Sequence, residues 1–501
     1  MNQLHLPLLE VAVFVPLAGA LLARRAEPDR ARRVAMFASG AAVAASVAAW
    51  FDLAVLRAFE AHDGVTLLGW LPGGDPFAVD ELSAPLLPLA ALIYFLTILA
   101  TLRTKSARFS LGMTLLSESI VLATLATKSS WGLLLLLAAG VVPPAVELRR
   151  RGESRRAFVL HMGAFLVLLS AGVATQQFDA LGANSEAIGA CLIALAVLIR
   201  SGVFPLHCWF PDLFERASFG TAILFTTPLA GPYAALRLVL PTAPGWVLTL
   251  VAVAALATAV YAAGMSLVQR DARRFFAYLL LSQASLVLLG LELTSTLGLT
   301  GALCVWLSVG LAMTGFGLTL RCVESRVGRI DLQRYNGLHD AAPTLSGLFL
   351  LTGMASIGFP GTIGFVALEL LVEGAVHSAP TIGMLLLLTT ALNGVAVMRA
   401  YFQVFTGARH AGTIDLRVRP SENIAVLVLS LLILGGGLAP QPGVASREHA
   451  AEALLEQRAS RGEPDAMDNA AAGESTATEN TQPQFLPDHS SDRPARALVL
   501  Q

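Results

Sequence analysis

The sequence predicts an all-α polytopic membrane protein, and three features of the chain lead to that fold class. Of the 501 residues, 55% are hydrophobic and only 14% are charged, whereas a soluble protein of this size carries about 25% charged residues. Apolar runs long enough to cross a bilayer recur along the chain. The alternating polar and apolar pattern of a membrane β-barrel is absent from the sequence.

We expect about 14 transmembrane helices. The first run is expected to be a retained helix, because the N-terminus lacks the basic start and small-residue cleavage site of a signal peptide. The expected spans are 6–23, 34–57, 81–102, 109–127, 129–147, 157–176, 187–204, 218–237, 246–268, 275–293, 297–320, 343–371, 378–403 and 421–440.

The distribution of basic residues predicts the orientation. One set of alternate loops holds 24 Lys and Arg residues, and the other set of interhelical loops holds only Lys128, with Arg57 and Arg237 at span edges on the same side. Because basic residues in short loops mark the cytoplasmic face, we expect a multi-pass inner (plasma) membrane protein with both termini on the external side. Residues 441–501, rich in Ala, Glu, Asp, Ser, Thr and Pro, predict a mostly disordered external tail with a weak helix near 446–458.

Two of the expected spans contain helix-breaking residues at membrane depth. Span seven runs into "SGVFPLHCWFP" (201–211), which contains Pro205 and Pro211, and the second proline is expected to stop a helix. Span twelve contains "SIGFPGTIGF" (356–365), with Gly358, Pro360, Gly361 and Gly364. Irregular backbone survives in a membrane only where it is buried in protein or lines a cavity. Plain packing kinks are the alternative interpretation.

The breaks lie five spans apart, which is typical of inverted repeats. The chain then divides into helices 1–3 (1–108), a first five-helix repeat (109–240), a second repeat (241–405), a last span (406–440) and the tail (441–501).

Four ionisable residues are candidates for a proton path. Inserting an arginine at the centre of a membrane helix costs about 2.5–3.5 kcal/mol of free energy. We therefore expect Arg200 to pair with a carboxylate, and Glu118 and Glu369 are the candidates. Alternatively, Arg200 snorkels to the cytoplasmic face, Glu118 only packs, and Glu369 faces an external vestibule. His207 lies within the first break and suits proton exchange, or it only satisfies the broken helix.

No cofactor or metal site is visible in the sequence. Cys191, Cys208, Cys304 and Cys322 are scattered without metal-binding spacing, and no glycine-rich nucleotide loop follows a strand. We therefore expect no bound cofactor and no nucleic-acid partner.

Three motifs resemble the antiporter-like membrane subunits of NADH:quinone oxidoreductase (complex I), chain M in particular, and the related Mrp-type cation/proton antiporters. They are "SGVFPLHCWFPDLFE" (201–215), "RDARRFFAYLLLSQASLVLLG" (270–290) and "GFPGTIGFVALELL" (358–371), and the similarity covers roughly 110–405. The resemblance implies a subunit without redox centres, inside a multi-subunit membrane complex that couples electron transport to quinone with proton transport.

The chain departs from the family's buried proton relay. At positions that resemble the family's Glu, Lys and His, the sequence has mostly residues that cannot exchange protons, namely Ala138, Leu229, Gln283, Val309 and Leu368. Arg200 takes the place of a lysine, and arginine stays charged. Transport through this chain is thus expected to be weakened. Alternatives are a membrane subunit of an inorganic-carbon uptake or Mrp-type complex, or a non-conducting scaffold paralogue.

Overall fold

The computed structural model describes residues 2–56, 58–64, 76–101, 109–178, 185–290, 293, 295–408 and 419–461, and most of them are helical. The helices are α1 (Leu8–Arg25), α2 (Pro28–Leu56), α3 (Leu86–Leu99), α4 (Leu111–Ala126), α5 (Ser130–Arg150), α6 (Arg156–Gln177), α7 (Ser185–Ser201), α8 (Trp209–Arg216), α9 (Phe219–Thr226), α10 (Ala230–Ala234), the π-helix η3 (Ala235–Val239), α11 (Gly245–Val268), α12 (Ala272–Leu289), α13 (Thr296–Val327), α14 (Pro343–Ser356), α15 (Ile363–Ser378), α16 (Pro380–Phe405), α17 (Pro420–Leu438) and α18 (Gln441–Arg461).

The described helices confirm a membrane protein. Nine helical segments in the described ranges are long and apolar enough to cross a bilayer, and α3 and α4 are shorter apolar helices. The count of 14 spans, the inverted repeats and the domain boundaries stay predictions.

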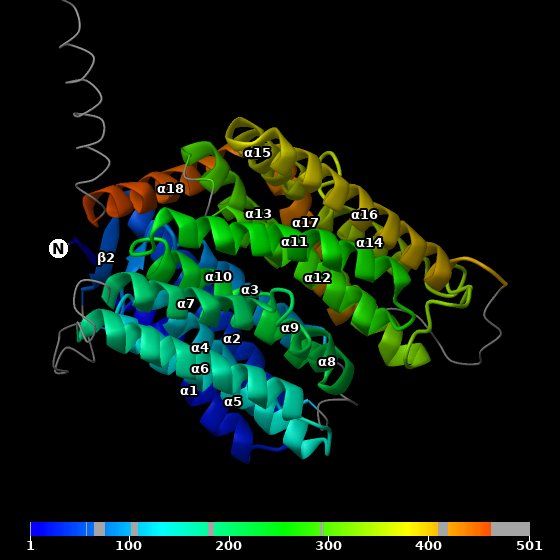
Figure 1. Cartoon of the computed structure of the whole chain (residues 1–501). Coiled ribbons are helices and arrows are strands. Elements are labelled where there is room, and N and C mark those ends of the chain that lie inside the picture. The colour runs from blue at the N-terminus through cyan, green and yellow to red at the C-terminus, as the bar shows by residue number, and fades with distance from the viewer. Residues whose placement is uncertain are drawn as a thin grey trace, which may run out of the picture.

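The helices form two neighbouring groups with α13 between them. In Figure 1, α1–α10 lie together in the lower part of the view and α11–α17 in the upper part. Helix α13 packs against α12, α14, α15 and α17, and it also reaches α3 and α9 of the other group. Most residues of α12 and α13 are buried, so the core of the described chain follows these two helices.

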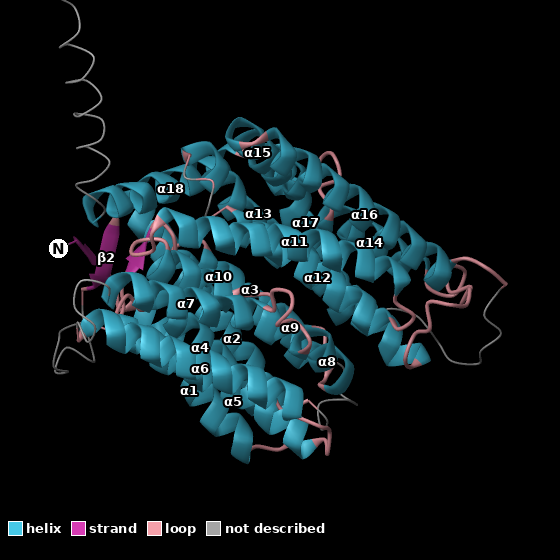
Figure 2. Ribbon diagram, in the orientation of Figure 1, coloured by secondary structure: helices cyan, strands magenta, loops and turns pink. Residues whose placement is uncertain are grey.

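A small three-stranded sheet, which the all-α prediction did not include, lies at one end of the bundle (Figure 2). Strand β1 (Asn2–Leu4) pairs parallel with β2 (Glu60–Asp63), which pairs antiparallel with β3 (Val79–Asp80). Strands of two to four residues are too short to show a period in the sequence. The Asp63 carboxylate accepts hydrogen bonds from the backbone N–H groups of Leu9 and Glu10, at 3.1 and 2.9 Å, so the sheet holds the start of α1.

Helix α18 confirms the weak helix predicted near 446–458 and extends it to residues 441–461, so the prediction of disorder is wrong for the rest of that range. The fully buried Arg447 donates hydrogen bonds to the carbonyl oxygens of Leu82 and Glu81, at 3.1 and 2.5 Å. Arg458 donates to those of Leu240 and Ala243, at 2.6 and 3.1 Å. The composition of this segment resembles a disordered chain, but its contacts are with residues far away in the sequence, which no local pattern reveals. Residues 462–501 lie outside the described residues.

Both predicted breaks are present, and a third interrupts the expected span 218–237. Helix α7 ends at Ser201 and α8 begins at Trp209, while α14 ends at Ser356 and α15 begins at Ile363. In the third break, α9 ends at Thr226 and α10 begins at Ala230, with Leu229 in the left-handed conformation (φ 52°, ψ 48°).

Candidate functional site

Arg200 is buried beside the first break, in the last turn of α7, with only 6% of its surface exposed. One guanidinium nitrogen donates to the carbonyl oxygen of Phe225, at 3.2 Å. The guanidinium carbon lies 4.0 Å from the centre of the Phe225 ring and 5.9 Å from that of Trp209. The burial rules out the snorkelling alternative, and an aromatic face with a carbonyl provides what a carboxylate was expected to provide.

A cavity of about 20 Å³ lies against Arg200 and is lined also by Ser117, Phe225 and Pro228. This is room for one water molecule. The Ser117 hydroxyl lies 2.7 Å from the hydroxyl of Tyr94, which is 3.3 Å from the carbonyl oxygen of Leu224. A short polar path therefore connects Tyr94 on α3 to the cavity beside Arg200.

Glu118 is also buried, but it points to a different helix. One carboxylate oxygen accepts a 2.7 Å hydrogen bond from the hydroxyl of Ser39 on α2, and the other has no hydrogen-bond partner in the described part of the chain. None of the ion pairs among the described residues joins Arg200 to Glu118 or Glu369. The structure does not bring together the partners expected for Arg200.

His207 lies in the first break, inside a cluster of aromatic rings. Its ring centre is 5.6 Å from that of Phe204, 5.1 Å from that of Tyr261 and 6.2 Å from that of Tyr278. The hydroxyl of Tyr261 lies 3.2 Å from the Nε2 atom of His207. The geometry joins a group that can exchange protons to a hydroxyl on α11, so both interpretations of His207 stay open.

Side chains take over the hydrogen bonds that the first break leaves open. The backbone N–H of Phe204 donates to the hydroxyl of Thr258, at 3.0 Å, and the indole N–H of Trp209 donates to the carbonyl oxygen of Ile199, at 2.9 Å. Pro205 lies between α7 and α8, as expected. The prediction that Pro211 stops a helix is wrong: it is the third residue of α8, where a missing N–H costs nothing.

The second break is built from glycines, and no ionisable side chain lies in it. Gly358 and Gly361 adopt positive φ angles of 80° and 85° on either side of Pro360. Glu369 follows on α15 and is exposed, as is Glu373 one turn further on. The structure therefore places Glu369 on the outer surface of the described chain, away from the first break.

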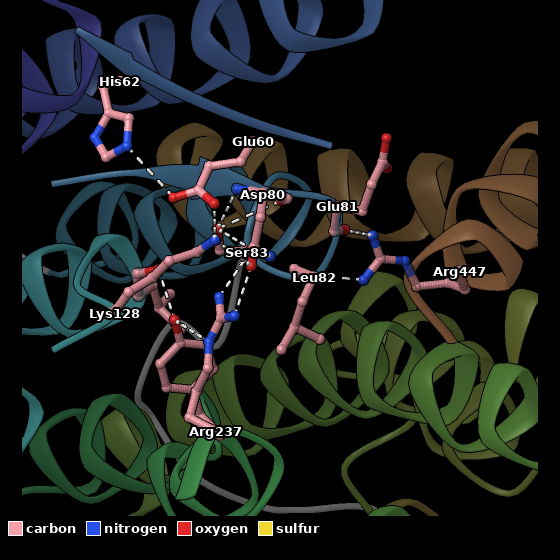
Figure 3. A network of polar contacts seen from close by, with 11 residues as sticks. Glu60, His62, Asp80, Glu81, Leu82, Ser83, Lys128, Arg237 and Arg447 are labelled. Atoms are coloured by element: carbon pink, nitrogen blue, oxygen red, sulfur yellow. Dashed lines mark hydrogen bonds and ion pairs between the residues drawn. The ribbon is translucent and has the colours of Figure 1, made fainter. Parts of the chain in front are cut away.

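A polar network that was not predicted lies at the sheet end of the molecule (Figure 3). Asp80 on β3 accepts two hydrogen bonds from the guanidinium of Arg237 on η3, at 2.5 and 2.8 Å, and lies 3.5 Å from the ammonium of Lys128. Burial alone would raise the pKa of the Asp80 carboxyl, but the charges of Arg237 and Lys128 hold that pKa well below its usual range. Lys128 also pairs with Glu60 of β2, at 2.6 Å.

This network joins distant parts of the chain. Arg237 also donates to the hydroxyl of Tyr233, at 3.1 Å, which donates to the carbonyl oxygen of Leu125 on α4, at 2.8 Å. Arg447 binds the carbonyls directly after Asp80. The sequence signal that could have revealed the network was the rarity of basic residues in the interhelical loops and at the span edges on this side, since Lys128 and Arg237 are two of the three there.

The comparisons with known proteins agree with the fold and the motifs. Residues 156–393 match the family model described as "NADH:quinone oxidoreductase/Mrp antiporter, TM". This segment belongs to the NADH:quinone oxidoreductase/Mrp antiporter family. It contains α6 to α15 and most of α16, and thus the first two breaks, Arg200, His207 and Glu369.

Relatives extend the similarity beyond the family segment. The NAD(P)H-quinone oxidoreductase chain 4 1 of Synechococcus sp. (strain JA-3-3Ab) is 28% identical over 486 residues, which cover 88% of this chain and 91% of that protein. A chain in the structure of respiratory complex I from Thermus thermophilus with bound NADH superposes with a TM-score of 0.78 and 24% identity, over 90% of this chain and 99% of that one. A chain in the structure of the Mrp complex from Dietzia sp. DQ12-45-1b superposes with a TM-score of 0.79 and 19% identity, over 91% of this chain and 99% of that one. The sequence similarity thus extends over most of the chain, and the two solved structures share its fold.

Proposed function

We propose that this chain is a membrane subunit of a multi-subunit complex of the NADH:quinone oxidoreductase type, in the plasma membrane with both termini external, and that it moves protons weakly or not at all through its first half. The matching family segment and the relatives named as quinone oxidoreductase chains support the first part of this proposal. The arrangement around Arg200 supports the second.

The observation that carries the proposal is a buried cation held by a ring and a carbonyl. A relay residue must gain and lose a proton, and an arginine keeps its charge even when buried. A fixed positive charge beside a cavity for one water molecule repels an incoming proton, because charges interact strongly where the dielectric constant is low. Arg200 therefore acts as an electrostatic barrier in the first half of the chain.

Membership of a complex is tested by affinity purification from native membranes through a tag on the C-terminus. We expect quinone-reductase subunits among the proteins that copurify. Recovery of a single unrelated soluble protein would contradict this assignment and favour the inorganic-carbon uptake alternative, and recovery of cation-antiporter subunits would favour the Mrp-type alternative. Recovery of no partner would favour the scaffold alternative.

The barrier is tested by proton flux in vesicles reconstituted with the purified complex. Arg200→Lys keeps the positive charge but introduces an amine that can release its proton when it is buried. We expect a higher proton flux than in the wild type, on the order of tenfold, since a barrier lowered by about 1.4 kcal/mol gives that factor. Arg156→Lys, an exposed position at the start of α6, is the matched control. Equal flux in wild type and Arg200→Lys would show that Arg200 is not the barrier.

A further inference from the structure

A groove of about 650 Å³ runs between α1, α4 and α5, at the end of the bundle opposite the small sheet. Of these helices, α1 and α5 lie along the lower edge of the view in Figure 1. Apolar side chains line most of the groove, among them Leu17 and Leu21 of α1, Leu116 of α4 and Val142 of α5. Leu21 and Val142 are 65% and 49% exposed, so the groove opens on the outer surface of the described bundle.

Two arginines stand at one end of the groove. Arg24 is in the last turn of α1 and Arg150 is the last residue of α5, and both line the groove and are exposed. The ion pairs of the described residues include neither of them. The groove is therefore amphipathic. Most of its lining is apolar, and at one end it has two arginines that form no ion pair among the described residues.

The start of α4 adds hydrogen-bond donors at the same end. Ser110 is the N-cap of α4, and its side chain makes no capping hydrogen bond. Ser110, Leu111, Gly112 and Met113 all line the groove. The first N–H groups of a helix have no partner within the helix and favour negative charge. Gly112 lets α4 approach α1 closely here, since a Cβ atom would make a tight contact of 3.2 Å with the carbonyl oxygen of Ala20 on α1.

The two carboxylates that line the adjoining hollow are already engaged. A second hollow of about 540 Å³ shares Ser110, Met113 and Arg150 with the groove and is lined also by Glu147 and Glu153. The two oxygens of Glu147 accept hydrogen bonds from the backbone of Ser218 and the hydroxyl of Thr221. Glu153 lies 3.8 Å from Arg216. These acids therefore do not neutralise Arg24 and Arg150.

We propose that this groove binds one anionic phospholipid, with an acyl chain between α1 and α5 and the phosphate between Arg24, Arg150 and the first turn of α4. Charge complementarity selects this occupant: a zwitterionic lipid offers the same acyl chain but no net charge to the two arginines. The basic residues at this end correspond to the cytoplasmic face of the predicted topology, where anionic lipids attract basic groups. The proposal does not depend on whether the chain moves protons.

The test is native mass spectrometry of the full-length chain in a non-ionic detergent, titrated with phosphatidylglycerol or with phosphatidylcholine of the same acyl chains. We expect phosphatidylglycerol to bind about 30-fold more tightly than phosphatidylcholine, the preference that two basic residues near a lipid surface provide. Arg24→Gln/Arg150→Gln should bring the affinity for phosphatidylglycerol down to that for phosphatidylcholine. Equal binding of the two lipids to the wild type would overturn the proposal.

Two further variants distinguish a lipid bound in the groove from general electrostatic attraction between anionic lipid and the basic surface. Arg149→Gln/Arg156→Gln removes the same charge from exposed residues that do not line the groove, and we expect it to bind phosphatidylglycerol like the wild type. Val142→Trp fills the exposed side of the groove and keeps both arginines, and we expect it to lower the binding of both lipids at least fivefold. An equal loss of phosphatidylglycerol affinity in the two double variants, or wild-type lipid binding in Val142→Trp, would show that the groove is not a specific lipid site. Size-exclusion chromatography checks the fold of each variant, and Val142→Trp still decides the question if the arginine variant aggregates.

Discussion

The break between α7 and α8 and the break between α14 and α15 interrupt the two halves of the chain, but they are held by different means. A hydrogen bond accepted by Thr258 and another donated by Trp209 stabilise the first break, with His207 inside it and Arg200 just before it. The second break relies on Gly358 and Gly361 at positive φ angles. The first half thus keeps ionisable side chains at membrane depth, whereas the second half uses close backbone contact.

The same contrast extends to the packing around the breaks. In the first half, η3, which continues α10 after the third break, contains Arg237, and this arginine is paired with Asp80. In the second half, α13 and α15 cross at Gly301 and Gly374, where a Cβ atom on either glycine would lie 2.4 Å from the backbone of the other helix. Small residues that let backbones approach are a common way to join membrane helices. Removing charge should therefore harm the first half, and adding volume should harm the second.

The largest effect is expected from Asp80→Asn. The substitution leaves the guanidinium of Arg237, 11% exposed, without its main counter-ion, and such a loss costs about 3–5 kcal/mol. Stability in detergent, measured by thermal unfolding and by titration with a denaturing detergent, should fall accordingly. Arg334→Gln is the control, because its ion pair with Asp331 is 86% exposed on the arginine side and should contribute less than about 1 kcal/mol.

The same pair predicts a pH dependence. Because the pKa of Asp80 is lowered in the folded chain, its stabilisation is complete above the pKa of an unfolded aspartate, about 3.9, and is lost as the pH falls towards the folded value. The wild type should lose stability below about pH 4 more steeply than Asp80→Asn does. Parallel curves for the two proteins between pH 7 and 3 would show that this carboxylate does not hold the first half.

A smaller effect is expected from Gly301→Ala in the second half. The added Cβ atom would lie 2.4 Å from the backbone nitrogen of Leu371, and backbone can move only by separating α13 from α15. Overpacking of this kind costs about 1–3 kcal/mol. Gly264→Ala on α11 is the matched control, since nothing lies within 4 Å of its Cβ position. It should be neutral or stabilising by about 0.5–1 kcal/mol, as alanine favours a helix. The comparison breaks down if both alanine variants unfold at the wild-type temperature.

Local sequence signals were enough to predict the helices and the first two breaks. Long apolar runs indicate membrane helices, and prolines or clustered glycines mark the places where such helices break. The partners of the buried charges could not be predicted in this way. Arg237 and Asp80 are separated by 157 residues in the chain, and Arg447 reaches Leu82 across 365. A carboxylate was expected for Arg200 because burial of a charge demands compensation, but a ring and a carbonyl supply it.

The third break also shows, at a single residue, that local sequence signals do not predict every feature of the structure. "TTPLAGP" (226–232) contains two prolines and a glycine, yet the residue in the left-handed conformation is Leu229, where a side chain is disfavoured. Its neighbours Pro228 and Ala230 line the cavity beside Arg200. The strain therefore lies next to Arg200, one of the proton-path candidates of the first half.

The smallest expected effect is the difference in stability between two variants of Leu229, which measures this strain. Leu229→Ala and Leu229→Gly both remove the buried leucine side chain, but only glycine also removes the Cβ atom that disfavours a φ of 52°. Leu229→Gly should therefore unfold at a higher temperature than Leu229→Ala, with a difference of about 1 kcal/mol. At Leu224, which is buried in the regular helix α9, the order should reverse, since glycine is about 1 kcal/mol worse than alanine inside a helix. If alanine is the more stable substitution at both positions, the third break stores no strain, and the two halves differ only in their charges.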